Sequence, residues 1–102
     1  MANKERSVKY SPTDYLKTKE DMVEYLNAAI EDGNERVLLM ALRNVVDALG
    51  GMTRLAKGTG LTRESLYRTL SENGNPRLSS LVAMLHYMDL ELAVRPRSGS
   101  RR

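Results

Sequence analysis

The side chains with the clearest chemical potential lie between residues 52 and 70. Arg63 and Arg68 carry planar guanidinium groups, and an arginine can donate two hydrogen bonds to a guanine edge or bind a phosphate. Tyr67 can hydrogen-bond a phosphate or pack on a thymine methyl group. Glu64 can accept a hydrogen bond from cytosine, although an ordinary ion pair with Arg68, four residues later, is the plainer alternative. These residue types favour recognition of DNA.

Two short helices joined by a tight turn would direct these side chains outward. Ala56, Gly60 and Leu66 follow one another at spacings of four and six residues. They supply a small residue where two helices cross, a glycine able to adopt positive φ in the turn, and an apolar residue that points inward. Thr53 is expected to cap the first helix, which runs through Lys57, and Thr62 the second. The pattern is typical of a helix-turn-helix; an ordinary helical hairpin is the alternative.

The expected contact surface extends to both sides of the second helix. Thr53 and Arg54 begin the preceding helix, where phosphate contact is favoured by the positive helix end. Asn75 and Arg77 follow in the next loop and are candidates for an adjacent phosphate. The predicted DNA-binding residues are Thr53, Arg54, Thr62, Arg63, Glu64, Ser65, Tyr67, Arg68, Asn75 and Arg77. Because one such unit covers little DNA, sequence-specific binding favours a homodimer on two half-sites.

Capping signals and helical periodicity predict further helices around this unit. The expected elements are a short turn after Ser11, a helix from Thr18 to Gly33, a helix from Asn34 to Gly50, a loop over 71–76 and a helix from Leu78 to Met88. The segment Leu90–Val94 is interpreted as a short strand, or as an extended segment that packs on the body or on a second subunit. The fold class is therefore all-α, with a central helix-turn-helix and a short C-terminal extended segment.

Length and composition fit one folded domain. The chain has 102 residues, of which 41% are hydrophobic and 28% charged, as in ordinary globular proteins. Residues 1–9 are expected to form a flexible arm, residues 10–95 the domain, and residues 96–102 a disordered basic tail. The chain contains no cysteine, which excludes disulfides and thiolate chemistry. No signal peptide or membrane span is evident, so a cytoplasmic protein is expected.

Charge divides the chain into two parts. Residues 13–47 contain four basic and eight acidic residues, whereas residues 53–77 contain five basic and two acidic ones. Two partners of different charge would suit this division. Chance scatter of charge over solvated helix faces is the plainer alternative for the acidic part.

Catalysis, cofactors and metals find no support in the sequence. His86 is the only histidine, and no partners stand at ligand spacing from it. Ser79 and Ser80 are expected at the start of a helix. No base is evident that could activate either hydroxyl as a nucleophile. Four methionines on apolar stripes are expected in the core: Met22, Met40, Met84 and Met88. We therefore expect neither an enzyme nor a cofactor.

Two long segments carry a family resemblance. LAKGTGLTRESLYRTLSENGNPRLSSLVAMLHYMDLELAV, with DYLKTKEDMVEYLNAAIEDGNERVLLMAL before it, resembles the addiction module antidote proteins, which are HigA-type antitoxins of bacterial toxin–antitoxin operons. The resemblance runs from about Tyr10 to Pro96. It implies a λ-repressor-like fold, a dimeric operon autorepressor, and a RelE/ParE-superfamily (HigB-like) toxin as partner, usually an mRNA-cleaving ribonuclease.

Three positions depart from that family pattern. Gly58 falls inside the first helix of the motif, where it is expected to cost up to about 1 kcal/mol relative to alanine. Thr69 replaces an apolar residue, whose role Leu70 is expected to cover. Asp89 replaces the glycine often found after the last helix. These departures bear on stability rather than on the DNA-facing residues.

The resemblance also gives the acidic part of the chain a partner. A toxin that binds RNA is usually basic, so an acidic surface would speed its association. The residues expected to contact the toxin are Asp14, Glu20, Asp21 and Glu24. Two other functions stay open: a stand-alone transcriptional regulator without a toxin, and a protein-interaction module that no longer binds DNA. A neighbouring gene for a RelE/ParE-like protein would distinguish an antitoxin from a stand-alone regulator. A steep fall of DNA affinity with salt would exclude a module that no longer binds DNA.

Overall fold

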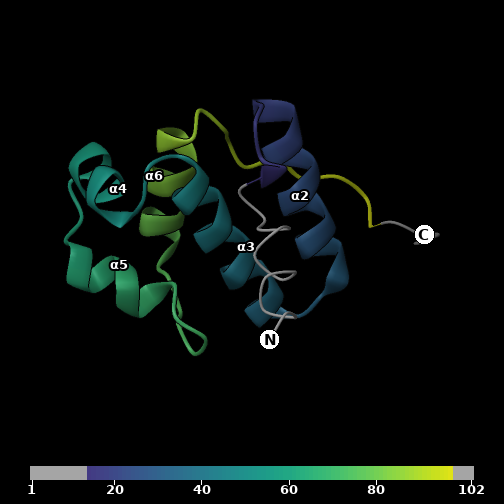
Figure 1. Cartoon of the computed structure of the whole chain (residues 1–102). Helices are drawn as coiled ribbons and strands as arrows, with labels where there is room; N and C mark the ends of the chain where they lie inside the picture. The colour runs from purple at the N-terminus through teal and green to yellow at the C-terminus, as the bar shows by residue number, and fades with distance from the viewer. Residues whose placement is uncertain (1–13, 98–102) are drawn as a thin grey trace, which may run out of the picture.

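The computed structural model describes residues 14–97, so the expected N-terminal arm, the expected helix start at residues 11–13 and residues 98–102 of the tail lie outside it. The short turn expected around Tyr15 and Leu16 is present, with the Lys17 amide donating to the Tyr15 carbonyl at 3.0 Å. The described part contains five helices (Figure 1): α2 (Lys19–Asp32), α3 (Glu35–Ala48), α4 (Met52–Thr59), α5 (Arg63–Thr69) and α6 (Leu78–Tyr87). The predicted all-α fold is confirmed. Residues 14–97 include no strand, so Leu90–Val94 is extended chain and its interpretation as a strand is wrong.

Helix α2 begins and ends at the residues that local capping chemistry favours. The Thr18 hydroxyl accepts a hydrogen bond from the Asp21 amide at 3.0 Å, and the Asp21 carboxylate accepts one from the Thr18 amide at 3.0 Å. This reciprocal pair satisfies amides that the first helical turn cannot. Gly33 ends the helix at φ 84°, a left-handed conformation that glycine adopts without steric cost.

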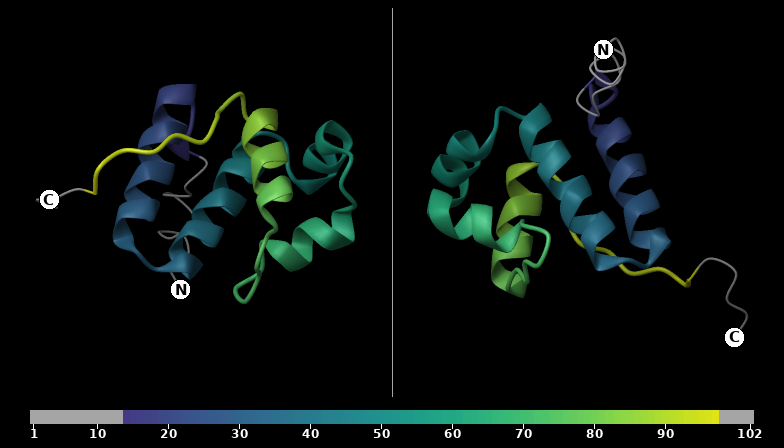
Figure 2. Two further views of the ribbon diagram at one scale, coloured as in Figure 1. Left: turned by 180° about the vertical axis from the view of Figure 1, so that it is seen from behind. Right: turned by 60° about the horizontal axis from the view of Figure 1, so that its bottom comes forward.

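Helix α3 follows at once and packs beside α2. The Asn34 carboxamide oxygen caps it by accepting from the Arg36 amide at 2.8 Å. The Asn44 side-chain amide then donates to the Tyr25 hydroxyl at 2.7 Å, which links the two helices. Figures 1 and 2 show α2 and α3 side by side at one end of the molecule, with α4 and α5 at the other.

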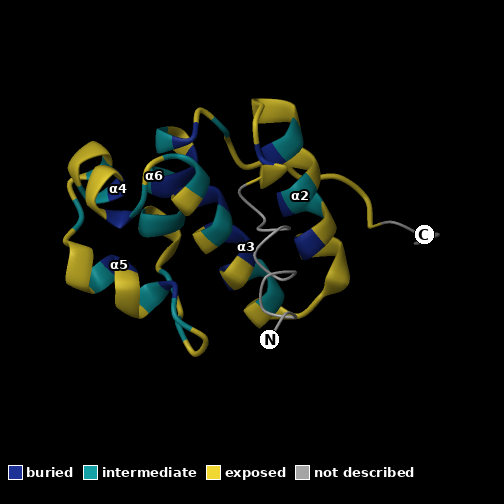
Figure 3. Ribbon diagram, in the orientation of Figure 1, coloured by how far each residue is buried: buried dark blue, intermediate teal, exposed yellow. Residues whose placement is uncertain are grey.

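The hydrophobic core runs between these two ends and draws on every described helix. Its most deeply buried members are Val45, Val46, Leu55, Leu66, Leu70 and Met84. Figure 3 shows that the buried positions of the helices face inward and the exposed positions face outward. Close packing of this kind fixes the rotation of each helix, and so decides which side chains face solvent.

One apolar residue expected inside lies outside. Met40 is 62% exposed, so its assignment to the core is wrong, whereas Met22, Met84 and Met88 are buried. The buried stripe of α3 runs through Leu39 and Leu42. Met40 follows Leu39 by one residue, which is about 100° around a helix and therefore turns it towards solvent.

Helix α4 also starts differently from the prediction. Its N-cap is Gly51, which has no side chain to bond the first amides, and Thr53 lies inside the first turn. The expectation that Thr53 caps this helix is therefore wrong. The helix continues to Thr59, two residues beyond the expected end at Lys57.

The chain leaves α6 through a tight turn and crosses towards α2. The Leu90 amide donates to the Leu85 carbonyl at 2.8 Å and the Asp89 amide to the His86 carbonyl at 2.9 Å, the bonding pattern of a Schellman motif. Asp89 holds φ 63° and forms an ion pair with Lys19. Figure 2 shows the following segment passing over α2.

Candidate nucleic-acid interface

Helices α4 and α5 form a compact pair joined by the turn Gly60–Thr62. Gly60 has φ 79° and donates its amide to the Ala56 carbonyl. The Thr59 hydroxyl donates to the Leu55 carbonyl at 2.8 Å and accepts from the Leu61 amide at 3.2 Å. These bonds satisfy the backbone across the turn. The predicted turn with positive φ at Gly60 is confirmed.

The rotation of α5 is fixed by its apolar side chains. Leu66 and Leu70 are each only 1% exposed, and the Thr62 hydroxyl caps the helix by accepting from the Ser65 amide at 3.1 Å. The opposite face is therefore exposed along the whole helix (Figure 3). It carries Arg63, Glu64, Tyr67 and Arg68, with Ser65 half-buried at its edge.

Two side chains of this face contact each other. The guanidinium carbon of Arg63 lies 5.6 Å from the centre of the Tyr67 ring, within the range of a cation–π interaction. Three ion pairs form among residues 14–97, and neither Glu64 nor Arg68 belongs to any of them. The ion pair between these two residues, offered as the plainer alternative, is not formed. Glu64 and Arg68 thus project from the exposed face of α5.

Arg54 lies at the junction of α3 and α4. A Cβ atom added to Gly50 would come within 2.2 Å of Arg54 Cδ and 2.9 Å of its Nη1, so the arginine side chain packs directly across Gly50. Thr53 is exposed beside it. Both residues belong to the first turn of α4, where backbone amides have no helical acceptor.

The loop after α5 packs tightly against the end of that helix. A Cβ atom on Gly74 would lie 2.0 Å from the Thr69 carbonyl oxygen, so only glycine fits there. Glu72 pairs with Arg36 of α3 at 3.5 Å. Asn75 and Arg77 are exposed, and Arg77 makes no side-chain cap on α6. The structure therefore places the predicted contact residues on α4, on α5 and just after α5.

The arrangement is an exposed surface that offers hydrogen-bonding groups and positive charge. Within residues 14–97, no three side chains of His, Asp or Glu gather as a metal site would require. None of the described helices has the length and apolarity needed to cross a membrane.

Comparison with known proteins decides the family. A family model described as "Probable addiction module antidote protein" matches residues 6–96. The chain belongs to this family. A relative from Haemophilus influenzae (strain ATCC 51907 / DSM 11121 / KW20 / Rd), described as "Uncharacterized protein", is 28% identical over 85 residues, which span 83% of this chain and 87% of the relative. No solved structure gives a significant match.

Family membership gives the chain an antitoxin role in an addiction module, and with it a toxin partner. The predicted resemblance to antidote proteins is confirmed at this level.

The acidic residues expected to face a toxin lie at the start of the antitoxin's helix α2 and just before it. Asp14, Glu20 and Glu24 are exposed, whereas Asp21 is half-buried. The Asp21 carboxylate accepts from the backbone amides of Thr18 and Lys17, and these bonds lower its pKa below the ordinary value. Asp21 thus has a structural function as a helix cap.

One exposed basic residue beside the antitoxin's α4–α5 surface was missing from the predicted set. Lys57 lies in the last turn of α4 and is exposed. The signal was present in the sequence: with Leu55 turned inward, a residue two positions later falls on the opposite side of the helix.

Proposed function

We propose that this antitoxin binds operator DNA through α4 and α5 as a helix-turn-helix, with α5 in the major groove, and represses its own operon. The observation that carries the proposal is the outer face of α5. Burial of Leu66 and Leu70 turns Arg63, Tyr67 and Arg68 into solvent on one short helix. A convex helix with projecting guanidinium groups matches the width and the acceptor pattern of the major groove.

The α5 side chains divide into two kinds of contact. Arg68 projects without an ion-pair partner among the described residues, and is suited to a bidentate contact with guanine. Arg63 lies over the Tyr67 ring, which orients its guanidinium group and limits the rotamers it must give up on binding. Glu64 adds an acceptor for cytosine.

Phosphate contacts would flank the recognition helix. Thr53 and Arg54 stand in the first turn of α4, and Asn75 and Arg77 follow the end of α5. Contacts to the backbone on both sides would fix the orientation of α5 in the groove without adding sequence information. Lys57 would add a further electrostatic contact.

The proposal includes a homodimer. A seven-residue recognition helix reads only a few base pairs, so operator specificity requires two copies on two half-sites. A two-fold protein axis would then coincide with a two-fold operator axis.

The toxin partner in this proposal belongs to the RelE/ParE superfamily and is HigB-like. Such a toxin binds RNA and carries positive charge, which the exposed carboxylates Asp14, Glu20 and Glu24 complement. Helix α2 and the α4–α5 pair lie at opposite ends of the molecule (Figure 1). One copy would therefore be able to hold DNA and toxin at separate surfaces, in the cytoplasm and without catalysing a reaction.

A mobility-shift titration tests DNA binding. The protein is titrated at physiological salt against its own promoter fragment and an unrelated fragment of equal length. We expect selective binding to the promoter, with an affinity that falls steeply as salt rises. Equal weak binding to both fragments, with the same result after the toxin is added, would overturn the repressor function.

A matched pair of arginine variants tests the role of α5. Arg68→Ala is expected to weaken promoter binding by about 1–3 kcal/mol and to relax specificity at one position. Arg43→Ala removes the same charge from an exposed site on α3, and is expected to leave promoter binding nearly unchanged. Equal losses in the two variants would mean that α5 does not read bases.

A further inference from the structure

The segment Glu91–Arg97 is extended chain that crosses the surface without secondary structure. Every residue in it is exposed, including Leu92 at 53% and Val94 at 99%. Within residues 14–97, the last backbone hydrogen bond along the chain is the one that the Leu90 amide donates to Leu85. The segment therefore offers a row of backbone donors and acceptors next to exposed aliphatic side chains, as the edge of a sheet does.

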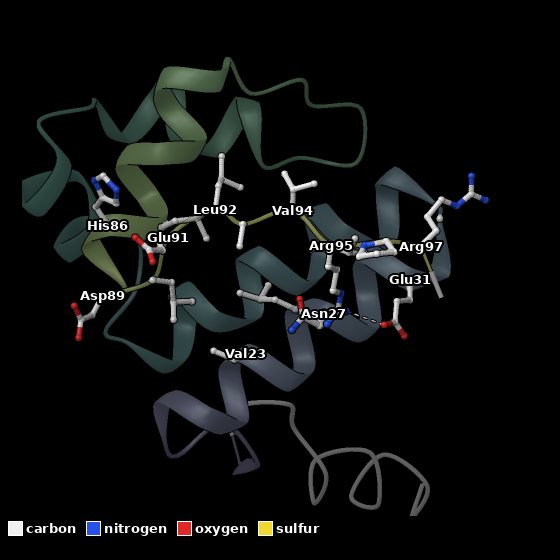
Figure 4. Close-up of a pocket in the computed structure, with 17 residues that line it drawn as sticks. Val23, Asn27, Glu31, His86, Asp89, Glu91, Leu92, Val94, Arg95 and Arg97 are labelled. Carbon is white, nitrogen blue, oxygen red and sulfur yellow. Dashed lines mark hydrogen bonds and ion pairs between the residues drawn. The ribbon is translucent and has the colours of Figure 1, made fainter. Parts of the chain in front are cut away.

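Side chains of this segment alternate between two sides. Figure 4 shows Leu92 and Val94 pointing the same way, while Arg95 points towards α2. The Arg95 guanidinium group donates to the Glu31 carboxylate at 2.8 Å, which holds the segment against the helix. Alternation of this kind means that the backbone already has the side-chain geometry of a strand and lacks only a partner.

We propose that this partner is the same segment of a second copy of the chain, paired antiparallel about a two-fold axis at Ala93. In this register Leu92 lies opposite the partner's Val94, and Glu91 lies opposite the partner's Arg95. Apolar residues thus face apolar residues, and a carboxylate faces a guanidinium group, twice by symmetry. Cross-strand pairs of these types stabilise antiparallel ribbons, whereas like charges in the same places destabilise them.

Neighbouring registers are poorer. Centring the axis on Leu92 places Arg95 opposite the partner's Asp89, whose left-handed backbone at φ 63° cannot extend a strand. Centring it on Val94 places Leu92 opposite the partner's Pro96, which has no amide hydrogen, and Ala93 opposite the partner's Arg95. The charge and backbone pattern therefore selects Ala93.

Additional apolar surface lies beside the segment. A groove between the segment and α2 is lined by Val23, Leu26, Ile30, Leu92 and Val94 among others (Figure 4), and Val23 and Ile30 are exposed. A two-stranded ribbon by itself is marginal in water. A second copy laid against this groove would bury apolar area beyond the ribbon, which such a ribbon needs for stability.

This interface would supply the homodimer that the proposed function requires. The role of the dimer in binding operator DNA rests on the proposed function, whereas the interface itself does not. The segment passes over α2, and α5 lies at the other end of the molecule (Figure 1). Pairing through Ala93 therefore leaves the α5 surfaces of both copies accessible. Tests of the interface need neither DNA nor toxin, so their failure is distinguishable from a failure of DNA binding.

Cysteine cross-linking tests the register in the full-length chain. The chain contains no cysteine, so Ala93→Cys introduces a single thiol at the two-fold axis. Residues directly opposite in an antiparallel pair have Cα atoms about 4.5–5.5 Å apart, within disulfide range. We expect nearly complete disulfide-linked dimer under mild oxidation. Arg97→Cys is an equally exposed control, and its two copies would lie about eight strand positions apart, so little cross-linking is expected.

A charge exchange tests the pairing of Glu91 with the partner's Arg95. Arg95→Glu places like charges opposite each other twice and is expected to raise the dimer dissociation constant about tenfold in sedimentation equilibrium. The double variant Glu91→Arg/Arg95→Glu is expected to recover most of that loss. Glu31→Gln removes only the contact of Arg95 within its own chain, and dimerisation is expected to stay unchanged.

Two outcomes would overturn the proposal. One is a chain that sediments as a monomer at micromolar concentration. If added toxin then protects the Ala93→Cys thiol from alkylation, the toxin rather than a second copy covers this segment. The other is a dimer in which the Ala93→Cys and Arg97→Cys variants cross-link equally, which would place the interface elsewhere.

Discussion

Gly58 of α4 lies directly against the aromatic ring of Tyr87 on α6. A Cβ atom at position 58 would sit 2.3 Å from Tyr87 Cδ1 and 2.4 Å from Cε1, far inside van der Waals contact. From sequence this glycine looked like a weak point in a helix. The structure shows that the missing side chain leaves room for the Tyr87 ring of α6 to lie against α4.

Gly58→Ala is therefore expected to destabilise the protein, although alanine is the better helix former. Overpacking of a close helix contact lowers the free energy of unfolding by about 1–3 kcal/mol. Urea denaturation at neutral pH measures the change. In a Tyr87→Ala background, where the ring is absent, the same substitution is expected to be neutral or stabilising by up to about 1 kcal/mol. A Gly58→Ala protein more stable than the parent would show that the contact is absent in solution.

Asp89 gives a prediction about the backbone. It is the one non-glycine residue with positive φ among residues 14–97, and it closes the turn after α6. Asp89→Ala and Asp89→Gly both remove the ion pair with Lys19, but only alanine meets steric strain in the left-handed region. We expect the alanine variant to melt roughly 5 °C below the glycine variant. Equal melting temperatures would indicate that the turn relaxes to another conformation.

Acid sensitivity follows from two carboxylates. Backbone hydrogen bonds from Thr18 and Lys17 lower the pKa of Asp21, and the hydrogen bond from Lys19 lowers the pKa of Asp89, each relative to the ordinary 3.8. A carboxylate whose pKa is lower in the folded state stabilises the protein above the unfolded pKa. That contribution is lost as pH falls through the folded value.

We therefore expect the free energy of unfolding to decline as pH falls below about 4. Asp21→Asn and Asp89→Asn should each flatten this decline, as seen in urea denaturation between pH 7 and pH 3. Glu24→Gln is the control, since Glu24 is an exposed carboxylate of α2 that makes no hydrogen bond to a backbone amide among the described residues. An equal effect of Glu24→Gln would attribute the acid sensitivity to general charge rather than to these bonds.

Much of the fold was predictable because the signals are local. Thr18, Asn34 and Thr62 cap helices by bonding amides two or three residues away, and Gly33 and Gly60 end helices through their own φ angles. Each of these features depends on a few consecutive residues, so the sequence displays it directly.

The features that sequence missed depend on distant residues. The contact between Gly58 and Tyr87 joins positions on different helices, and nothing near Gly58 indicates it. Met40 is an apolar residue within a helix, but tertiary packing buries its neighbour Leu39 and leaves Met40 exposed. The predicted DNA-facing set depends on the rotation of α5, which Leu66 and Leu70 did reveal.

The structural role of Asp21 sharpens the test of toxin binding. Reversing the charge of all the acidic residues at the start of α2 would also remove the Asp21 cap. A loss of toxin binding could then result from unfolding of α2 rather than from the changed charges. Glu20→Lys/Glu24→Lys leaves the cap intact and reverses two exposed charges. We expect toxin association to slow by about tenfold or more at low salt, because opposite charge steers encounter, with the difference shrinking as salt rises.

Stopped-flow or surface-based kinetics measure the toxin association rate, and promoter binding is titrated in parallel. Asp47→Lys, an exposed reversal near the end of α3, is compared with Glu24→Lys as a matched single change. Promoter affinity is expected to stay close to that of the parent in the α2 variants, because α2 and α5 lie at opposite ends of the molecule (Figure 1). Equal slowing of toxin association by Asp47→Lys and Glu24→Lys would mean that the net charge of the protein, rather than the α2 surface, determines the association rate. Equal loss of toxin and promoter binding would mean that the two surfaces are not separate.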